Sequence, residues 1–238
     1  MMKISIASTD RVFVLTGAGI SAESGLPTFR ASDGLWAGHR IEDVCTPEAL
    51  DQNPELVWQF YSQRRAQGAK AQPNAAHMAL ADIESKLGDR FFLCTQNVDD
   101  LHERAGSTRL VHMHGELAKS RCEHECGRPP IEDRAVYKSL SEVGHCVCGA
   151  RLRPHIVFFG EIPLEMNRIQ REISKATVMV VVGTSGSVYP AANFVHLAKQ
   201  AGARTFYIGP ESPLNAHAFT EVVEGKAGEV LPGLFAVE

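Results

Sequence analysis

A glycine-rich segment carries the first residues that could do chemistry. The apolar run VFVL at residues 12–15 precedes Gly17, Gly19 and Ala22, which fit the spacing G-x-G-x-x-G/A at a strand-to-helix turn. Glycines at such a turn let the backbone approach a pyrophosphate, whose charge meets the free N–H groups at the start of the helix. A tightly packed turn would explain the same spacing. The acid that usually binds the ribose has no good counterpart, so the sequence predicts an unusual mode of dinucleotide binding or none.

Polar side chains directly follow two further apolar runs. Asn97 and Asp99 come after the run FFLCT and are two residues apart, so both could point into one pocket. Helix capping is the alternative, because both residue types are favoured caps. His114 follows the run LVHM, and an imidazole titrates near neutral pH, which suits a general base. His112 is its rival, since alternate residues of a strand share a face.

Cysteines are concentrated in one stretch. Four of the six are Cys122, Cys126, Cys146 and Cys148. Two thiol pairs brought together by a short hairpin suit a tetrahedral zinc ion, which stabilises a segment too small to bury a core. The spacings are C-x3-C and C-x-C rather than C-x2-C, so His124 or His145 could replace a thiolate; free cysteines are the alternative. Four protein ligands leave no open position, so the predicted zinc is structural. Cys45 and Cys94 are isolated and are interpreted as core residues.

The elements that must position these groups follow an alternating pattern. Short apolar runs lie at residues 12–15, 91–95, 110–114, 156–159, 178–183 and 205–209. Segments of helical character lie at residues 47–65, with an interruption at Pro54, and at 74–87, 164–175 and 190–201. The alternation predicts an α/β fold with a Rossmann-like, doubly wound parallel sheet and ligands at the carboxyl ends of its strands. We expect this domain to comprise residues 1–35, 74–118 and 153–238. Residues 36–73, as a helical insertion, and 119–152, as a zinc-binding module, would form a smaller lobe.

Bulk properties exclude several classes of protein. The formal net charge of −4 argues against nucleic acid or membrane partners recruited by bulk electrostatics. The first ten residues make a poor secretory signal, and no run approaches the roughly 18 apolar residues of a membrane span. Clustered cysteines suit a reducing compartment, so we expect a cytoplasmic protein.

Five longer motifs resemble those of a known family. They are GAGISAESGLPTFR (17–30), TQNVDDLHERAG (95–106), HMHGEL (112–117), RPHIVFFGE (153–161) and GTSGSVYPAANF (183–194). In this order, and over most of the chain, they closely resemble the sirtuins, which are NAD-dependent protein-lysine deacylases. The resemblance implies that NAD is consumed. The bond to nicotinamide breaks, the acyl-lysine carbonyl oxygen attacks C1′ of the ribose, and the alkylimidate rearranges to free lysine and 2′-O-acyl-ADP-ribose.

The resemblance also implies four catalytic residues. His114, which precedes Gly-Glu, would be the base for a ribose hydroxyl. Asn97 would bind the carboxamide or a ribose hydroxyl, and Asp99 would hold the carboxamide of nicotinamide. Arg30 would place a charged fork near the phosphates and ribose, and its neighbour Phe29 would shield the ribose from water.

The implied NAD contacts are more numerous. They are Gly17, Ala18, Gly19, Ala22, Phe29, Arg30, Gln96, Asn97, Asp99, Gly183, Thr184, Ser185, Gly209 and Ala227. Ala18 and Gly19 would lie by the phosphates, the turn at Gly183 by the adenosine ribose, and Ala227 against adenine. Gly209 departs from the family pattern, because many relatives carry Asn there. A glycine has no side chain with which to bind the adenine ribose.

The segment FYSQRR at residues 60–65 bears on the acyl group. Tyr61 and Arg64 are three residues apart on a predicted helix and share a face. They match the Tyr-x-x-Arg pair of class III sirtuins, which accept acyl chains ending in a carboxylate, such as succinyl or malonyl. Arg65 could also face Tyr61, which leaves the register open. The acyl-lysine peptide is expected to add as an extended strand beside the segment Val157, Phe158, Phe159, Gly160 and Glu161.

Other functions predict different residues in the sequence. An ordinary oxidoreductase predicts an acid at the end of a second strand, which the sequence lacks. An NAD-binding sensor, or a mono-ADP-ribosyltransferase with weak deacylation, is the alternative function. For the deacylase that the resemblance implies, the expected partners are acyl-lysine proteins and NAD as co-substrate.

Overall fold

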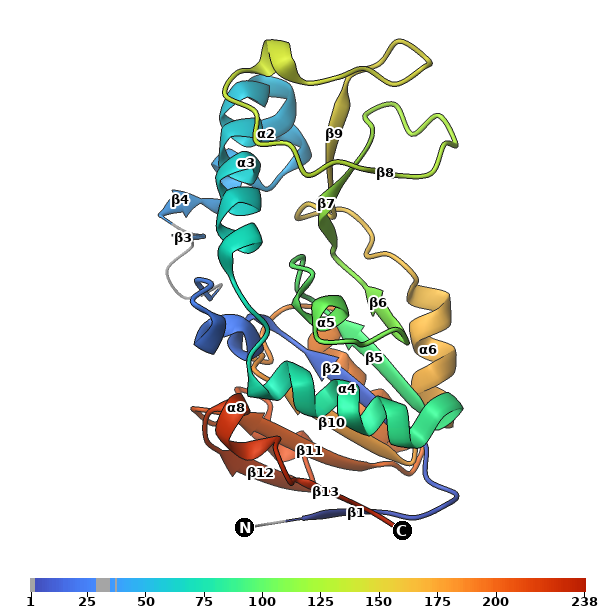
Figure 1. Cartoon of the computed structure of the whole chain (residues 1–238). Helices are drawn as coiled ribbons and strands as arrows, with labels where there is room; N and C mark the ends of the chain where they lie inside the picture. Colours follow the sequence, from blue (N-terminus) through green and yellow to red (C-terminus); the bar gives the residue numbers. More distant parts are fainter. Residues whose placement is uncertain (1–2, 29–34, 37) are drawn as a thin grey trace.

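The computed structural model describes residues 3–28, 35–36 and 38–238 (Figure 1). Its main sheet has six strands: β2 (Val12–Thr16), β5 (Phe91–Thr95), β6 (Leu110–His112), β10 (Val178–Val182), β11 (Arg204–Gly209) and β12 (Glu221–Glu224). Their spatial order is β12-β11-β10-β2-β5-β6, and every neighbouring pair is parallel. This is the strand order of a doubly wound dinucleotide-binding fold, so the predicted fold class is confirmed.

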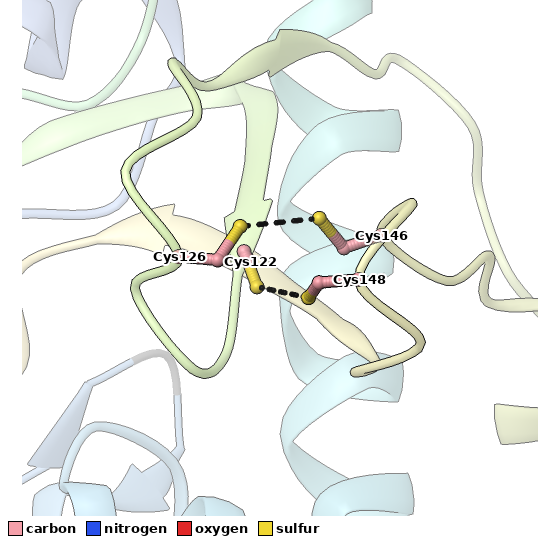
Figure 2. A group of neighbouring side chains, drawn as sticks. All are labelled: Cys122, Cys126, Cys146 and Cys148. Atoms are coloured by element: carbon pink, nitrogen blue, oxygen red, sulfur yellow. Dashed lines mark hydrogen bonds between the residues drawn. The ribbon is translucent and has the colours of Figure 1, made fainter.

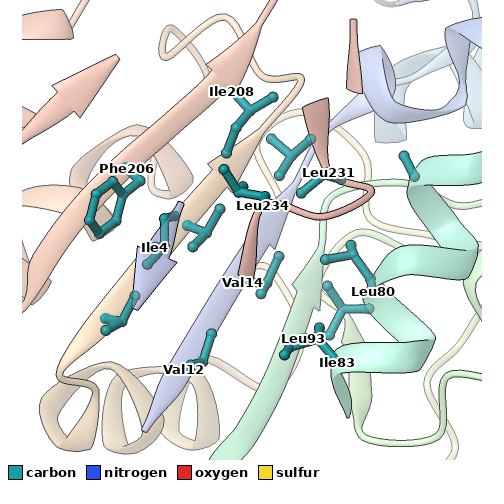
Figure 3. Close-up of a cluster of buried hydrophobic side chains, with 14 of the residues drawn as sticks. Ile4, Val12, Val14, Leu80, Ile83, Leu93, Phe206, Ile208, Leu231 and Leu234 are labelled. Atoms are coloured by element: carbon teal, nitrogen blue, oxygen red, sulfur yellow. The ribbon is translucent and has the colours of Figure 1, made fainter. Parts of the chain in front are cut away.

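Both faces of this sheet are covered, because alternate residues of each strand point to opposite sides. Val12 and Val14 pack with α4 (Ala75–Leu87) and α8 (Ala227–Val230), as Figure 3 shows. Phe13 and Leu15 pack instead with α6 (Met166–Lys175) and α7 (Phe194–Gln200). Burial on both faces accounts for the near-continuous apolar runs that predicted these strands.

Helices α1 (Ile41–Val44), α2 (Pro47–Gln52) and α3 (Pro54–Lys70) form the first insertion. The predicted interruption at Pro54 is confirmed: Asn53 ends α2 and caps α3, and its side chain accepts a hydrogen bond from the Leu56 N–H at 3.2 Å. A helical insertion without strands was expected, but β3 (Leu35–Trp36) and β4 (His39–Arg40) form a short antiparallel pair.

A second, three-stranded sheet follows the first. It consists of β7 (Gly115–Cys122), β8 (Ile131–Glu132) and β9 (Leu152–Ile156), in the order β8-β7-β9. The prediction of a strand at residues 156–159 is wrong. The strand ends at Ile156, and Phe158 lies beyond it, buried in the cluster around α3. An apolar run signals burial, but in this run α3 covers Phe158 and Phe159 is exposed. Pro154 is tolerated because β9 is an edge strand.

Arg65 attaches α3 to this second sheet. Its Nε donates to the Leu117 carbonyl at 2.8 Å, and its Nη1 lies 3.1 Å from an oxygen of Asp133. Both side chains of this ion pair are buried, with exposed fractions of 3% and 8%. The helical insertion and the cysteine-bearing segment thus form one lobe (Figure 1).

The described chain also has one short α-helix and a separate pair of short strands, besides several 3₁₀ helices. Helix α5 (Leu101–Arg104) follows β5, and β1 (Ile4–Ile6) pairs in parallel with β13 (Phe235–Val237). Among the described residues, no helix is long and apolar enough to cross a membrane.

Candidate active site

The glycine loop lies where the strand order reverses, between β2 and β10. Its backbone is tied to the turn after β10: Gly17 N–H donates to the Val182 carbonyl at 2.9 Å, and Gly19 N–H to the Gly183 carbonyl at 2.8 Å. A Cβ on Gly19 would lie 2.7 Å from Gly183 Cα. Only glycine fits, and the two backbones form a cradle without side chains at the place where a dinucleotide binds in this fold.

The 3₁₀ helix Ala18–Ser24 continues from this cradle and carries Ala18 and Ala22. Glu23 extends from it toward α8, where its carboxylate accepts a hydrogen bond from Gly228 N–H at 2.7 Å. Ala227, which the family match places by adenine, is buried at the start of α8. Glu23 therefore holds the glycine loop and Ala227 in one arrangement.

Ser21, Asn97 and Asp99 form a buried polar cluster at the carboxyl edge of the sheet. The Ser21 hydroxyl donates to Asp99 Oδ2 at 3.1 Å and accepts from Asn97 Nδ2 at 3.1 Å. Asp99 Oδ1 also accepts from the Leu101 N–H at 3.2 Å, but the N-cap of α5 is Asp100 and its side chain makes no capping hydrogen bond, so neither Asn97 nor Asp99 is a helix cap. Burial raises the pKa of Asp99. The cluster presents an amide and a carboxyl group in fixed positions, as recognition of a carboxamide requires.

His112 and His114 differ in which nitrogen remains available. His114 Nδ1 donates to the Gln96 carbonyl at 3.1 Å, which leaves the lone pair on Nε2. Burial lowers the pKa of His114, so the ring is a neutral base at pH 7. His112 donates from Nδ1 to the Asn97 carbonyl at 2.8 Å and from Nε2 to Glu103 at 2.7 Å. Burial alone would lower the pKa of His112, but Glu103 raises it.

Tyr61 and Arg64 are both buried on α3, and Arg64 is close enough to Asp99 for that carboxylate to affect its pKa. The Tyr61 hydroxyl donates to Cys45 Sγ at 3.3 Å, and its ring stacks on Phe158. Burial lowers the pKa of Arg64, against the opposing effects of Tyr61 and Asp99. Arg65 is bound to the second sheet through the Leu117 carbonyl and Asp133.

Residues 157–161 form hydrogen bonds with the backbones of His114 and Cys45. Val157 N–H donates to the His114 carbonyl at 3.0 Å, and Phe159 N–H to the Cys45 carbonyl at 2.9 Å. Glu161 stabilises the turn: its carboxylate accepts from Phe158 N–H at 2.7 Å and from Arg153 at 2.6 and 3.1 Å. Phe159 and Gly160 are exposed. The predicted substrate segment thus runs from the imidazole to the phenol.

The four thiols of the second lobe converge (Figure 2). Cys122 Sγ lies 3.5 Å from Cys148 Sγ, and Cys126 Sγ lies 3.5 Å from Cys146 Sγ. All four sulfurs are within 4.8 Å of one another, and among the described residues neither His124 nor His145 joins the group. Tetrahedral zinc with Zn–S bonds of about 2.3 Å sets its ligands about 3.8 Å apart. The four residues fit a structural zinc ion, and the two histidines are not needed.

Gly209, which the family resemblance places by the adenosine ribose, is the position at which this chain departs from the family pattern. A Cβ on Gly209 would collide with the Tyr207 hydroxyl. That hydroxyl donates to the Thr184 carbonyl at 3.1 Å, beside the exposed Ser185. The buried phenol thus takes the space of a side chain at position 209 and supports the turn that Thr184 belongs to.

The structure leaves two predicted residues unplaced and adds others. Phe29 and Arg30 lie outside the described residues. Ser21, Cys45 and Tyr207 were not predicted. Ser21 had a signal, since it lies within the glycine-rich motif, but the partners of Cys45 and Tyr207 are set by packing between distant segments.

Comparisons with known proteins match this arrangement. A model described as the Sir2 family matches residues 17–190. An NAD-dependent protein deacylase of Shigella flexneri is 53% identical over 225 residues, covering 93% of this chain and 81% of that protein. One from Pasteurella multocida (strain Pm70) is 49% identical over 234 residues, covering 95% and 97%. A crystal structure of a Sir2 homolog–NAD complex has a TM-score of 0.86 at 41% identity, covering 95% of this chain and 89% of that chain.

Proposed function

The chain belongs to the Sir2 family, and from that premise we propose that it is an NAD-dependent protein-lysine deacylase. It transfers the acyl group of a modified lysine to the ADP-ribosyl part of NAD and releases nicotinamide. The observation that carries the proposal is the hydrogen bond from His114 Nδ1 to the Gln96 carbonyl at 3.1 Å. That bond presents Nε2 as a base close to the buried Asn97 and Asp99.

NAD would lie across the carboxyl edge of the sheet. Its pyrophosphate would rest on the cradle of Gly17, Gly19 and Gly183, and its adenosine by Gly209 and Ala227. The carboxamide of nicotinamide would meet Asp99, whose raised pKa lets it act as a hydrogen-bond donor when protonated.

The residues of this chain then have distinct tasks. Asn97 would orient the carboxamide or a ribose hydroxyl, Asp99 would hold the carboxamide, and His114 would accept the proton of a ribose hydroxyl. We assign Arg30 to charge near the phosphates and Phe29 to exclusion of water, following the family motif. The acyl-lysine peptide would lie along residues 157–161 as an added strand, at the place where Phe159 and Gly160 are exposed.

We further propose that the enzyme removes succinyl and malonyl groups as well as acetyl groups. Tyr61 and Arg64 are both buried on α3, and the Tyr61 ring stacks on Phe158 of the proposed peptide segment. A guanidinium fork and a phenol in apolar surroundings favour a carboxylate over a methyl group.

The lobe that carries Arg64 would depend on zinc. Cys122, Cys126, Cys146 and Cys148 would hold the ion, which supplies cross-linking and no reaction chemistry. We keep the three-part division into residues 1–35, 74–118 and 153–238, residues 36–73 and residues 119–152 as a proposal. The need for reduced thiols supports action in the cytoplasm.

One experiment tests this function. Purified protein is incubated with NAD and acetyl- or succinyl-lysine peptide, and nicotinamide release and peptide mass are followed together. A deacylase releases one nicotinamide for each acyl group lost. Nicotinamide release with an unchanged peptide would indicate an NAD hydrolase or ADP-ribosyltransferase, and no turnover would indicate a sensor.

A further inference from the structure

Two threonine hydroxyls meet beneath the site. Thr16 ends β2 and Thr95 ends β5, they are paired in register, and both are fully buried. The Thr16 hydroxyl donates to Thr95 Oγ1 at 2.8 Å. Thr95 Oγ1 also accepts from the backbone N–H of Asn97 at 3.0 Å. Asn97, a proposed catalytic residue, is therefore linked to β2 and β5 by side-chain hydroxyls as well as by the peptide chain.

His102 begins this line of hydrogen bonds. It lies on α5 with an exposed fraction of 0%, and its Nε2 is 3.0 Å from Thr16 Oγ1. Because the Thr16 hydrogen is directed at Thr95, Thr16 must accept from His102, whose hydrogen is then on Nε2. Burial holds the pKa of His102 well below its ordinary value, so the ring is neutral and this tautomer is fixed.

The line ends in a loop segment. Residues 96–98 belong to no helix or strand. Asn97 forms three hydrogen bonds: its backbone N–H donates to Thr95, its carbonyl accepts from His112, and its side chain donates to Ser21. A small shift of this main chain would displace the amide and, through Ser21, the carboxyl of Asp99.

We propose that His102 is a positioning residue, which fixes the main chain of Asn97 through the hydroxyls of Thr16 and Thr95. The inference rests on the proposed deacylase function. His102 touches no reacting atom in this scheme and acts only through Asn97. A buried histidine that only stabilises the fold has to fill its volume. The role proposed for His102 requires in addition a hydrogen-bond donor to Thr16 at the position of Nε2.

The test compares wild type with His102→Leu and His102→Gln. The glutamine amide Nε2 can occupy the place of the imidazole Nε2, whereas leucine fills the volume without a donor. We expect His102→Leu to lower kcat at least tenfold, since misplacement on the order of 1 Å has large effects on rate. The KM for the acyl peptide should stay within about twofold, and His102→Gln should keep at least about a third of kcat.

A second pair of variants covers the case in which His102→Leu does not fold. Thr95→Val breaks the same line with a side chain of similar shape and should lower kcat in the same way. Thr205→Val is its matched control: Thr205 is equally buried in the same sheet, but its hydroxyl donates to the Ala218 carbonyl at 3.2 Å, remote from the site. That control should change the melting temperature and leave kcat within about twofold.

The outcomes separate the two proposals. Wild-type protein that removes no acyl group overturns the proposed function itself. Active wild type with unchanged kcat in His102→Leu or Thr95→Val overturns the positioning role, as does equal loss in His102→Gln and His102→Leu. Where both single variants are impaired, the double variant His102→Leu/Thr95→Val should lose little more than either, because both break one line.

Discussion

Replacement of Arg64 by methionine tests the acyl preference most directly. The variant Arg64→Met keeps the length and apolar stem of the side chain and removes the guanidinium. A charge-assisted hydrogen bond contributes about 1.5–3 kcal/mol, and each 1.4 kcal/mol corresponds to about a tenfold change. Because Arg64 is buried, with an exposed fraction of 8%, water cannot replace it well at the substrate carboxylate.

We therefore expect kcat/KM for a succinyl-lysine peptide to fall about 10- to 150-fold. The value for the matching acetyl-lysine peptide should change by no more than about threefold, because a methyl group makes no charged contact with position 64. Mass spectrometry of the two peptides at several concentrations measures both values. Equal losses on both peptides would show that Arg64 supports the fold or NAD instead of the acyl chain.

The neighbouring residue provides the matched control. Arg65 is equally buried on the same helix, but it is bound to Leu117 and Asp133. Arg65→Lys should lower the melting temperature through loss of the guanidinium contacts and leave the ratio of desuccinylation to deacetylation unchanged. A changed ratio in Arg65→Lys, with none in Arg64→Met, would reverse the assignment.

Four further predictions concern the catalytic residues, the zinc and the glycine loop. His114→Tyr should bind NAD by calorimetry but deacylate at least about a hundredfold more slowly, and near-normal turnover would refute the role of the base. Because the pKa of His114 is lowered from 6.5, kcat of the wild type should stay level near pH 7 and fall only as acid protonates Nε2, at a pH below 6.5; a fall that begins above 6.5 would contradict this direction. Freshly purified protein should contain about one zinc ion per chain, and chelation should lower its melting temperature; metal analysis without zinc would remove that claim. Gly19→Ala should weaken NAD binding, because its Cβ would lie 2.7 Å from Gly183 Cα.

The sheet and its ligand edge could be predicted from the sequence because strands buried on both faces leave continuous apolar runs. The run at residues 156–159 was misplaced for a related reason: apolar character reports burial and does not say what covers the residue. Phe158 is covered by the helical lobe. The C-x3-C and C-x-C spacings left the zinc ligands open, and only the fold of the hairpin shows that four thiols meet without a histidine.

Interactions between distant segments were beyond sequence reasoning. Arg64 and Arg65 are adjacent and chemically identical, and only the direction of each side chain on α3 separates the proposed substrate contact from the structural one. His102 likewise lies within a recognised motif, but its path to Asn97 runs through two hydroxyls on different strands. Such paths depend on strand register, which periodicity does not determine.

The contact between Tyr207 and Gly209 constrains how this enzyme could have diverged from relatives with Asn at that position. Asn introduced alone would strike the phenol, and a smaller residue at 207 introduced alone would leave the Thr184 carbonyl without its donor. Each single change is thus unfavourable, and changing both residues at once removes the clash that Asn creates alone. The two positions should behave as an epistatic unit, and an engineer who transplants the asparagine must replace the tyrosine in the same step.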